Sequence, residues 1–390
     1  MTTPLAVRSI SADEHLAFLR TRESASFLQT PAWAQVKKEW RAESIGWSLP
    51  GSPDGELVGV ALVLYRQLPT VRRYLAYLPE GPVIDWDTDD LGAWLVPMAA
   101  HLRAAGAFGI RIGPPVVLRR WSASQVKEGI ADDTVASLTT LPPTERSQAG
   151  AAVVSQLREL GWRAQGATGG FAAGQPQYNF WIPLRAADGT QRTEDDVLAG
   201  MNQQWRRNIK KAAKAGVVVS VSTSSTSGFD DDLAAFHTLY AHTAERDGFT
   251  PRPLAYFATM FDALSNADPA TIEIRLYTAH HEDDLVAATV WVRVGTHTWY
   301  SYGASSTDKR DVRGSNAVQW QMIRDSLAAG AATYDLRGIT DTLTGDDPHV
   351  GLVQFKVGTG GEAVEYAGEW DLPLNRMIHK AFELYLRRRG

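Results

Sequence analysis

Five basic side chains fall within one short stretch of this 390-residue sequence and are candidates for binding a charged partner. Met201, Trp205, Ile209 and Ala213 repeat every four residues, which predicts an amphipathic helix over residues 197–215. The basic residues of this helix are Arg206, Arg207, Lys210, Lys211 and Lys214. Such a row can contact the phosphates of a tRNA, or it can be an ordinary solvated helix face, and both interpretations stay open.

The residue types present argue against a metal site and against thiol chemistry. The sequence has no cysteine, which excludes disulfides, thiol nucleophiles and thiolate metal sites. Its nine histidines include the adjacent pair His280 and His281, which would point to opposite faces of a strand, and no HExxH spacing occurs. We therefore expect neither a metal nor another cofactor.

Composition predicts a globular chain of two domains that does not coat nucleic acid non-specifically. Hydrophobic residues make up 44% and charged residues 21% of the sequence, and the net charge is −5. No apolar run approaches the roughly 18 residues that cross a bilayer, and residues 1–20 lack the apolar core of a signal peptide. We therefore expect a cytoplasmic protein.

The first half of the chain predicts a mixed α/β unit. Thr30-Pro31 predicts the start of a short helix, and the polar run 186–194 predicts a domain boundary. Between them we expect antiparallel strands over 57–65 and 72–78, a helix over 89–105, a strand over 108–112, a helix over 151–160, and strands over 162–164 and 178–184. Residues 119–146 contain few large apolar side chains, so we expect a peripheral excursion there.

The second half predicts a similar unit. After the basic helix we expect a helix over 233–246, another from Pro251, strands over 272–279, 285–294 and 297–304, a helix over 315–329 and a basic C-terminal helix over 374–388. The helix–glycine–strand junction at Gly106 recurs at Gly330. This recurrence indicates one unit used twice, although a generic junction is the plainer alternative.

Strands followed by a helix and a further strand suggest an acetyltransferase-like fold, in which a glycine-containing loop binds the pyrophosphate of coenzyme A. At that junction the chain reads Asp311-Val312-Arg313-Gly314-Ser315-Asn316, with an acidic residue and an asparagine where the loop needs Arg or Gln and a small residue. A helix start binds phosphate only where the backbone can approach closely and the field is positive. The fold without coenzyme A points to another acyl donor.

Five sequence blocks, in order along almost the whole chain, carry a resemblance to a known family. They are Phe27-Leu28-Gln29-Thr30-Pro31-Ala32-Trp33 with Lys37, Trp205-Arg206-Arg207-Asn208-Ile209-Lys210-Lys211-Ala212 with Gly216, Arg246-Asp247-Gly248-Phe249 with Arg252 and Tyr256, Tyr302-Gly303-Ala304, and Gly351-Leu352-Val353-Gln354-Phe355-Lys356. In these blocks the chain resembles the Fem-type (FemABX) peptidoglycan bridge aminoacyltransferases. The long helical hairpin of some members has no evident counterpart, so the resemblance is to a compact member.

This resemblance implies an α/β protein with mixed sheets, built from two tandem acetyltransferase-like (GNAT) domains. The first would comprise residues 1–187 plus 366–390, with the C-terminal helix returning to it, and the second residues 188–365. The implied donor is aminoacyl-tRNA, and the implied acceptor is the side-chain amine of a precursor pentapeptide, either UDP-MurNAc-pentapeptide or lipid II. Carried onto this sequence, Lys37, Arg252, Tyr256 and Tyr302 would contact the precursor, and Phe355 and Lys356 would lie at the reaction centre. Trp33 would line the groove or stack on a sugar or base.

The implied reaction needs a positive group where charge develops. As the acceptor amine adds to the aminoacyl ester, the ester oxygen becomes negative, and the ammonium of Lys356 would stabilise it. The amine must also be neutral, yet an ordinary lysine amine has a pKa of about 10.4. The general base is not identified, because Gly113-Pro114 stands where some relatives have an acidic residue before the proline.

Arg252 and Tyr256 are four residues apart, which predicts one helical face that could hold a diphosphate, with Lys37 supplying a second charge. The alternative is that Arg252 pairs with a surface carboxylate while Tyr256 packs in the core.

For the whole protein, two other functions stay open: a coenzyme A-dependent N-acyltransferase and a non-catalytic protein that binds tRNA or precursor. The residues do not distinguish which amino acid is transferred. If lipid II is the acceptor, Arg387, Arg388 and Arg389 are candidates for contact with the inner membrane face.

Overall fold

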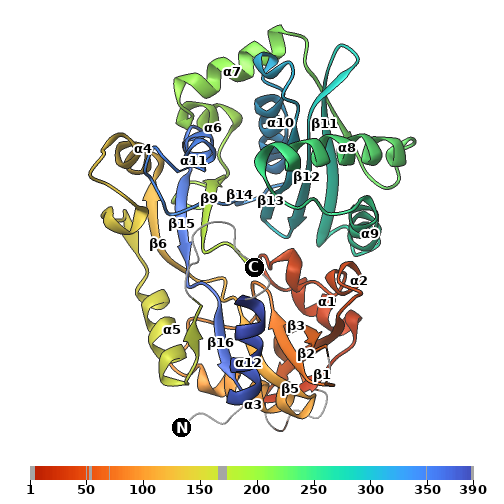
Figure 1. Cartoon of the computed structure of the whole chain (residues 1–390), viewed down its shortest axis with the longest axis vertical. Coiled ribbons are helices and arrows are strands. Elements are labelled where there is room, and N and C mark those ends of the chain that lie inside the picture. The colour runs from red at the N-terminus through yellow and green to blue at the C-terminus, as the bar shows by residue number, and fades with distance from the viewer. Residues whose placement is uncertain are drawn as a thin grey trace. The chain divides into compact units, whose positions relative to one another are not determined.

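The computed structural model describes residues 5–49, 51, 55–69, 71–165, 174–347 and 349–387, and it divides into two compact units (Figure 1). The first unit contains Met1–Arg119, Glu145–Gln177 and Glu365–Gly390, and the second contains Arg120–Thr144 and Tyr178–Val364. The chain therefore passes between the units four times. Residues 120–144 and 178–187, which we expected in the first domain, fall in the second unit.

The first unit is built on a seven-stranded sheet with the order β1-β2-β3-β4-β5-β16-β8. Its strands are β1 (Ala6–Ser9), β2 (Arg41–Ser48), β3 (Leu57–Gln67), β4 (Tyr74–Leu78), β5 (Ala107–Ile112), β16 (Trp370–Pro373) and β8 (Arg163–Ala164). Its helices are α1 (Ala12–Leu19), α2 (Trp33–Val36), α3 (Gly92–Ala104), α5 (Gln148–Glu159) and α12 (Arg376–Arg387), with the short turn η1 (Phe27–Gln29). Strands β4 and β5 are parallel, and β16 pairs antiparallel with both β5 and β8.

The second unit is built on a longer sheet, in which β10-β11-β12-β13-β14-β9-β15-β6 are neighbours in that order. The strands are β10 (Val218–Ser222), β11 (Ile272–His281), β12 (Asp284–Val294), β13 (His297–Ser305), β14 (Thr333–Gly338), β9 (Tyr178–Pro183), β15 (Glu362–Tyr366) and β6 (Val117–Ser122). The helices are α4 (Ala123–Ala131), α6 (Glu194–Gly200), α7 (Gln203–Lys214), α8 (Phe229–Asp247), α9 (Leu254–Ser265), α10 (Gly314–Ala328) and α11 (Val350–Val357). Its short 3-10 helices are η2 (Leu138–Thr140) and η3 (Arg310–Val312), whereas the residues of the two-residue strand β7 (Glu145–Arg146) belong to the first unit.

Both units repeat the acetyltransferase-like order, which confirms the predicted fold. In the first, antiparallel β3 and β4 are followed by α3 and by β5, parallel to β4. In the second, antiparallel β12 and β13 are followed by α10 and by β14, parallel to β13. Gly106 (φ 94°) and Gly330 (φ 69°) end the two helices in left-handed conformations that favour glycine. The C-terminal helix α12 belongs to the first unit and packs on β5, as expected.

Two expected elements differ from the structure. The predicted excursion over 119–146 is wrong, because Trp121, Val126 and Leu138 are buried in the core of the second unit. The helix predicted over 197–215 is two helices, α6 and α7, separated at Met201 and Asn202. The Asn202 side chain accepts a hydrogen bond from the Trp205 backbone N–H at 2.8 Å, so it starts α7 afresh.

Within the described ranges, no helix combines the length and the apolar content that crossing a bilayer requires.

Candidate active site

Lys356 is the most buried of the candidate charged residues. It lies on α11 with 3% of its surface exposed, and its Nζ donates to the carbonyl oxygens of Gly338 at 2.6 Å and Arg337 at 3.3 Å. Burial lowers the pKa of Lys356 to about 7, with Asp335 acting to raise it and Arg337 acting to lower it. The side chain therefore changes charge near neutral pH.

The carbonyl oxygens that hold Lys356 lie at the end of β14, where β13 and β14 stop pairing. In the described strands the parallel register runs from His297–Thr333 to Trp299–Asp335, although β13 continues to Ser305 and β14 to Gly338. The β14 register against β9 shifts between Asp335 and Gly338. Inside this irregularity Arg337 has φ 62°, and its backbone N–H donates to Asp335 Oδ1 at 2.6 Å. The Lys356 ammonium is thus held by carbonyl oxygens at the end of β14, where β14 no longer pairs with β13.

Tyr302 lies on β13, in the part of the strand beyond its last residue pair with β14. Its φ of 51° and the register shift between β12 and β13 mark a distorted stretch of strand. A Cβ on the next residue, Gly303, would overlap the hydroxyl of Tyr300, so a larger residue there requires the Tyr300 side chain to move. Burial raises the pKa of Tyr302, while the charge of Arg337 lowers it. Arg337 therefore acts electrostatically on both Tyr302 and Lys356.

The hydroxyls of Tyr302 and Tyr256 form a hydrogen-bonded pair with an Oη–Oη distance of 2.9 Å. The Tyr302 ring packs edge-on against Phe257, at 5.1 Å between centroids, and against Tyr240, at 6.3 Å. These contacts hold the pair between the middle of α8 and the first turn of α9. Each hydroxyl can both donate and accept, so together they can bind a polar group of a substrate.

Arg252 lies next to Tyr256, but the predicted shared helical face is wrong. Helix α9 begins at Leu254, after Pro253 in an extended conformation (ψ 156°), so Arg252 lies outside it. The exposed Arg252 guanidinium lies 5.4 Å from the Tyr256 ring centroid. The carbonyl oxygen of Arg252 accepts a hydrogen bond from His237 Nε2 at 3.1 Å, if that nitrogen is protonated. This contact ties the segment to α8.

Phe355 packs against Trp205, with ring centroids 4.8 Å apart, and its carbonyl oxygen accepts a 2.8 Å hydrogen bond from Trp205 Nε1. Gly358 lies directly against the indole, and a Cβ there would overlap Trp205 Cδ1. Trp205 is itself buried. It therefore fixes α11, and with it Lys356, rather than offering a stacking surface.

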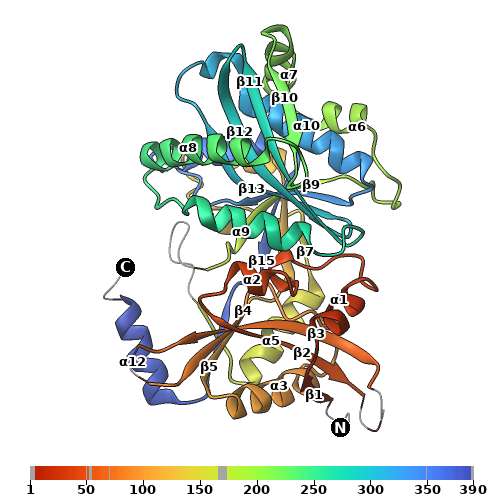
Figure 2. The same cartoon turned by 90° about the vertical axis from the view of Figure 1, so that its right-hand side faces the viewer.

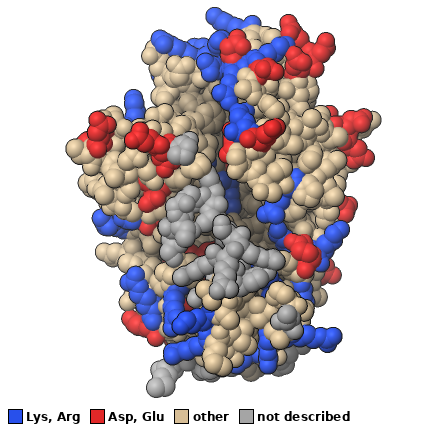
Figure 3. All heavy atoms as spheres, in the orientation of Figure 1, with Lys and Arg blue, Asp and Glu red and all other residues tan. Residues whose placement is uncertain are grey.

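The basic row of α7 separates into two parts. The Arg206 guanidinium donates to the carbonyl oxygens of Leu198, Ala199 and Met201, so it caps the end of α6 and is not a free cation. The remaining cations are exposed: Arg207, Lys210, Lys211 and Lys214. Figure 3 shows blue side chains gathered at the end of the molecule where α7 lies.

Trp33 and Lys37 lie in the first unit, on and just after α2. Trp33 is 3% exposed and packs edge-on against Phe27, so its ring supports the segment from inside. Lys37 follows the helix, with its ammonium 4.0 Å from Glu39 Oε1. Buried Gln29 anchors the segment, because its Oε1 accepts from Leu62 N at 3.0 Å and its Nε2 donates to Pro79 O at 2.8 Å.

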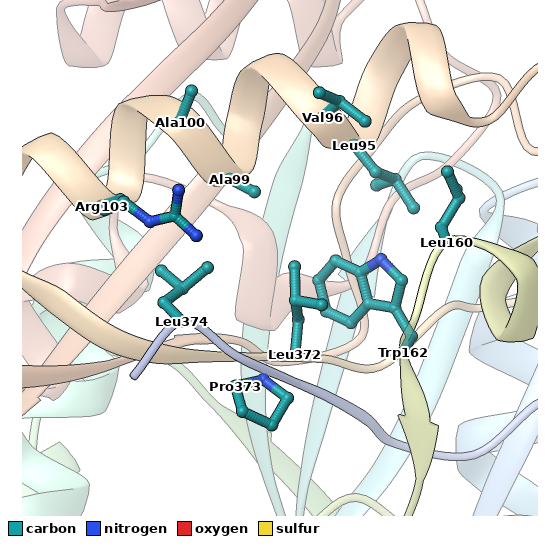
Figure 4. A pocket seen from close by; sticks show the side chains of 10 residues that line it. All are labelled: Leu95, Val96, Ala99, Ala100, Arg103, Leu160, Trp162, Leu372, Pro373 and Leu374. Carbon is teal, nitrogen blue, oxygen red and sulfur yellow. The ribbon is translucent and has the colours of Figure 1, made fainter. Parts of the chain in front are cut away.

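A pocket of about 230 Å³ in the first unit lies apart from these residues. It is formed by α3, β16 and the residues around β8 (Figure 4). Its lining is Leu95, Val96, Ala99, Ala100, Arg103, Leu160, Trp162, Leu372, Pro373 and Leu374. No candidate site residue is among them.

Sequence reasoning missed Asp335, Arg337 and Gly303. Two features of the sequence could have pointed to them. Asp335 and Arg337 are opposite charges two residues apart at the end of a strand, just before Gly338, and Gly303 is a glycine inside a strand. Only the distortions of β13 and β14 bring these residues to Tyr302 and Lys356.

Comparison with known proteins places the fold and the site in context. The FemAB family model matches residues 10–274 and 270–387. The chain is 24% identical over 441 aligned residues to the lipid II:glycine glycyltransferase of Staphylococcus aureus (strain MRSA252), covering 96% of this chain and 94% of that protein. The crystal structure of FemX aligns with a TM-score of 0.76 at 22% identity, covering 97% of this chain and 99% of FemX. The structure of L-PGS from Bacillus licheniformis aligns with a TM-score of 0.53 at 11% identity, covering 97% of both chains.

Proposed function

Because this chain belongs to the FemAB family, an acyltransferase family, we propose that it moves an amino acid from aminoacyl-tRNA to the peptide of a peptidoglycan precursor. The curated relatives are named for glycine transfer to lipid II, which supports bridge building as the process. The observation that carries the proposal is Lys356, a buried lysine held by two strand-end carbonyl oxygens where β13 and β14 part. A tRNA donor places the reaction in the cytoplasm.

The proposed step forms one bond and breaks one. The acceptor amine adds to the carbonyl carbon of the aminoacyl ester, the carbon–nitrogen bond forms, and the ribose oxygen leaves with the proton that the amine loses. Two of the three N–H bonds of protonated Lys356 are directed at Gly338 O and Arg337 O. We assign the third to the developing oxyanion, which a pre-positioned ammonium in a dry site stabilises strongly.

Precursor binding is assigned to polar groups that the two units present separately. In the second unit, the Tyr256–Tyr302 hydroxyl pair would bind polar groups of the precursor, and the exposed Arg252 guanidinium would bind its phosphate. In the first unit, Lys37 would add a second cation. Phe355 would line the reaction centre from α11. Trp33 would act indirectly, through the packing that holds α2.

The donor tRNA is assigned to the exposed cations of α7. Arg207, Lys210, Lys211 and Lys214 provide a phosphate-binding row on one helix, whereas Arg206 is occupied in capping α6. Contacts to phosphates do not depend on the tRNA sequence. They would position the tRNA, while other residues of the enzyme would bind its aminoacylated 3′ end.

The test is mass spectrometry of UDP-MurNAc-pentapeptide and of lipid II, each incubated with the protein and charged tRNA. We expect a gain of one aminoacyl residue on one acceptor, abolished by ribonuclease and by Lys356→Met. Parallel reactions with acyl-coenzyme A and without tRNA test the rival donor. A ribonuclease-insensitive, coenzyme A-dependent gain, or no gain on either acceptor, would refute the proposal.

A further inference from the structure

Helix α12 of the first unit has two apolar faces, and among the residues that the structure describes only the inner face packs against a cluster of buried side chains. Its inner face places Phe382 and partly buried Ile378 against Leu75 and Phe108 of the sheet. On the other side, Met377 is 82% exposed and Leu384 is 52% exposed, one near each end of the helix. Ala381, also exposed, lies between them at helical spacing. An amphipathic helix packed on a sheet needs only its inner face to be apolar, so folding does not explain the outer stripe.

Cations border this outer stripe. Arg376 and Lys380 are exposed, and they lie on the turns of α12 that carry Met377 and Ala381. The sequence of α12 contains Arg376, Lys380 and Arg387 against Glu383, three basic residues and one acidic, a net charge of +2. The same helix therefore presents apolar side chains beside positive charge, the pattern of helices that lie in a membrane interface.

The turn after β3 extends this surface. Leu68 packs on the same cluster as Phe382, which places the turn beside α12. On that turn Val71 is 47% exposed, and its neighbours Arg72 and Arg73 are exposed cations. Figure 2 shows α12 along the outer side of the first sheet.

We propose that this surface, made of Met377, Ala381, Leu384 and Val71 with Arg376, Lys380, Arg72 and Arg73, docks on an anionic lipid bilayer. Exposed apolar side chains insert at the boundary between headgroups and acyl chains, while the cations meet lipid phosphates. An RNA partner would not require the apolar stripe, and an apolar protein groove would not require the four cations.

The position of this surface fits an enzyme whose acceptor is held in a membrane. The Arg66 guanidinium lies 5.8 Å from the Phe382 ring of α12 and 5.8 Å from the Trp40 ring, three residues after Lys37. These contacts connect the Lys37 segment to α12 within the same unit. The docking proposal itself stands on exposure and charge and does not require the transferase proposal.

Vesicle co-sedimentation of the full chain tests the docking. We expect binding to phosphatidylglycerol-containing vesicles, and weak binding to pure phosphatidylcholine vesicles. Arg376→Gln with Lys380→Gln should weaken binding about fivefold per removed charge, and Met377→Glu with Leu384→Glu should abolish it. Val96→Glu is the matched control, because Val96 is a 59% exposed apolar residue on α3 of the same unit. Thermal unfolding should be unchanged in all variants.

Two outcomes would overturn the proposal. One is that Met377→Glu with Leu384→Glu binds anionic vesicles as well as Val96→Glu does. The other is that the unaltered chain self-associates in light scattering and loses this association with the α12 variant, which would assign the stripe to a second copy. Transfer to UDP-MurNAc-pentapeptide and to detergent-solubilised lipid II, measured in the same variants, separates the two proposals: it should be unaffected, and its absence on both acceptors in every variant would refute the transferase proposal alone.

Discussion

Lys356 is a charged group that the fold keeps almost entirely from water, and this makes its protonation part of the folding equilibrium. In the folded chain its pKa is about 7, below the ordinary lysine value of 10.5, because burial disfavours the ammonium. Between these pH values the unfolded chain binds one proton more than the folded chain, so stability rises with pH across this window. Below pH 7 both states are protonated, and the dependence ends.

Lys356→Met should remove this dependence. From pH 7 to pH 9 the unfolding free energy of the unaltered protein should rise relative to that of the variant by about 2 kcal/mol. Denaturant unfolding at several pH values measures the difference. A difference between the two proteins that stays constant from pH 7 to pH 9 would contradict the lowered pKa.

Gly303→Ala should disturb Tyr302 and lower stability. The added methyl group would overlap the Tyr300 hydroxyl, and relieving that overlap in a packed site costs about 1–3 kcal/mol. Gly345→Ala is the matched control, because a Cβ there meets no atom within 4 Å. We expect Gly303→Ala to lower the melting temperature and the transfer rate, while Gly345→Ala changes neither. Equal melting temperatures for the two variants would show that the overlap is easily relieved.

At this scale the sequence predicted candidate residues but not their surroundings. Family-like blocks single out Lys356, Tyr256 and Tyr302, yet the two tyrosines are far apart in the chain and meet only because α9 packs on the sheet that contains β13. Arg337 was not predicted, because its influence on Tyr302 and Lys356 depends on a left-handed residue inside β14. Side-chain periodicity contains no signal for such a distortion.

At the scale of elements, α7 can be tested as a unit, because its free cations share one helix. Lys210→Glu with Lys211→Glu should weaken tRNA binding and reduce the salt dependence of what remains, since each phosphate contact contributes to the slope with salt concentration. Lys127→Glu is the matched control, an exposed lysine on α4 of the same unit. Filter binding across a salt series measures both quantities. If the two variants lose the same amount of tRNA affinity, then α7 contributes only to the overall charge of the protein and is not a specific tRNA contact.

The predicted bounds agree with the structure to within four residues in β3, β12, α8 and α10. The exceptions have local causes. The predicted 197–215 helix breaks at Asn202, which satisfies a backbone N–H of the next helix and so competes with continuation. Arg252 falls outside α9 because the residue before a proline avoids the helical conformation. The buried role of 119–146 was missed because three well-placed apolar residues suffice to attach a segment to a core.

At the scale of the whole molecule, the order of the strands in the first sheet differs from their order in the sequence. Strand β16 (Trp370–Pro373) lies between β5 and β8, although it follows β8 by about half and β5 by about two thirds of the chain length. A chain ending at residue 365 should therefore lose protection of β5 amides in hydrogen exchange, because β5 pairs with β16 along its length. A chain ending at residue 387 keeps β16 and α12 and should behave as the full chain does. Unchanged β5 protection in the shorter chain would contradict the role of β16.

The interleaved strand order also has a consequence for how the protein is made. Domains usually fold in the order in which the ribosome releases them. Here the first unit cannot complete its sheet until β16, which follows the whole second unit in the sequence, has left the ribosome. While the second unit is being synthesised, the sheet of the first unit therefore keeps an unpaired strand edge. A ribosome that stalls before β16 is translated would therefore release a chain with an exposed edge, which chaperones and proteases can recognise.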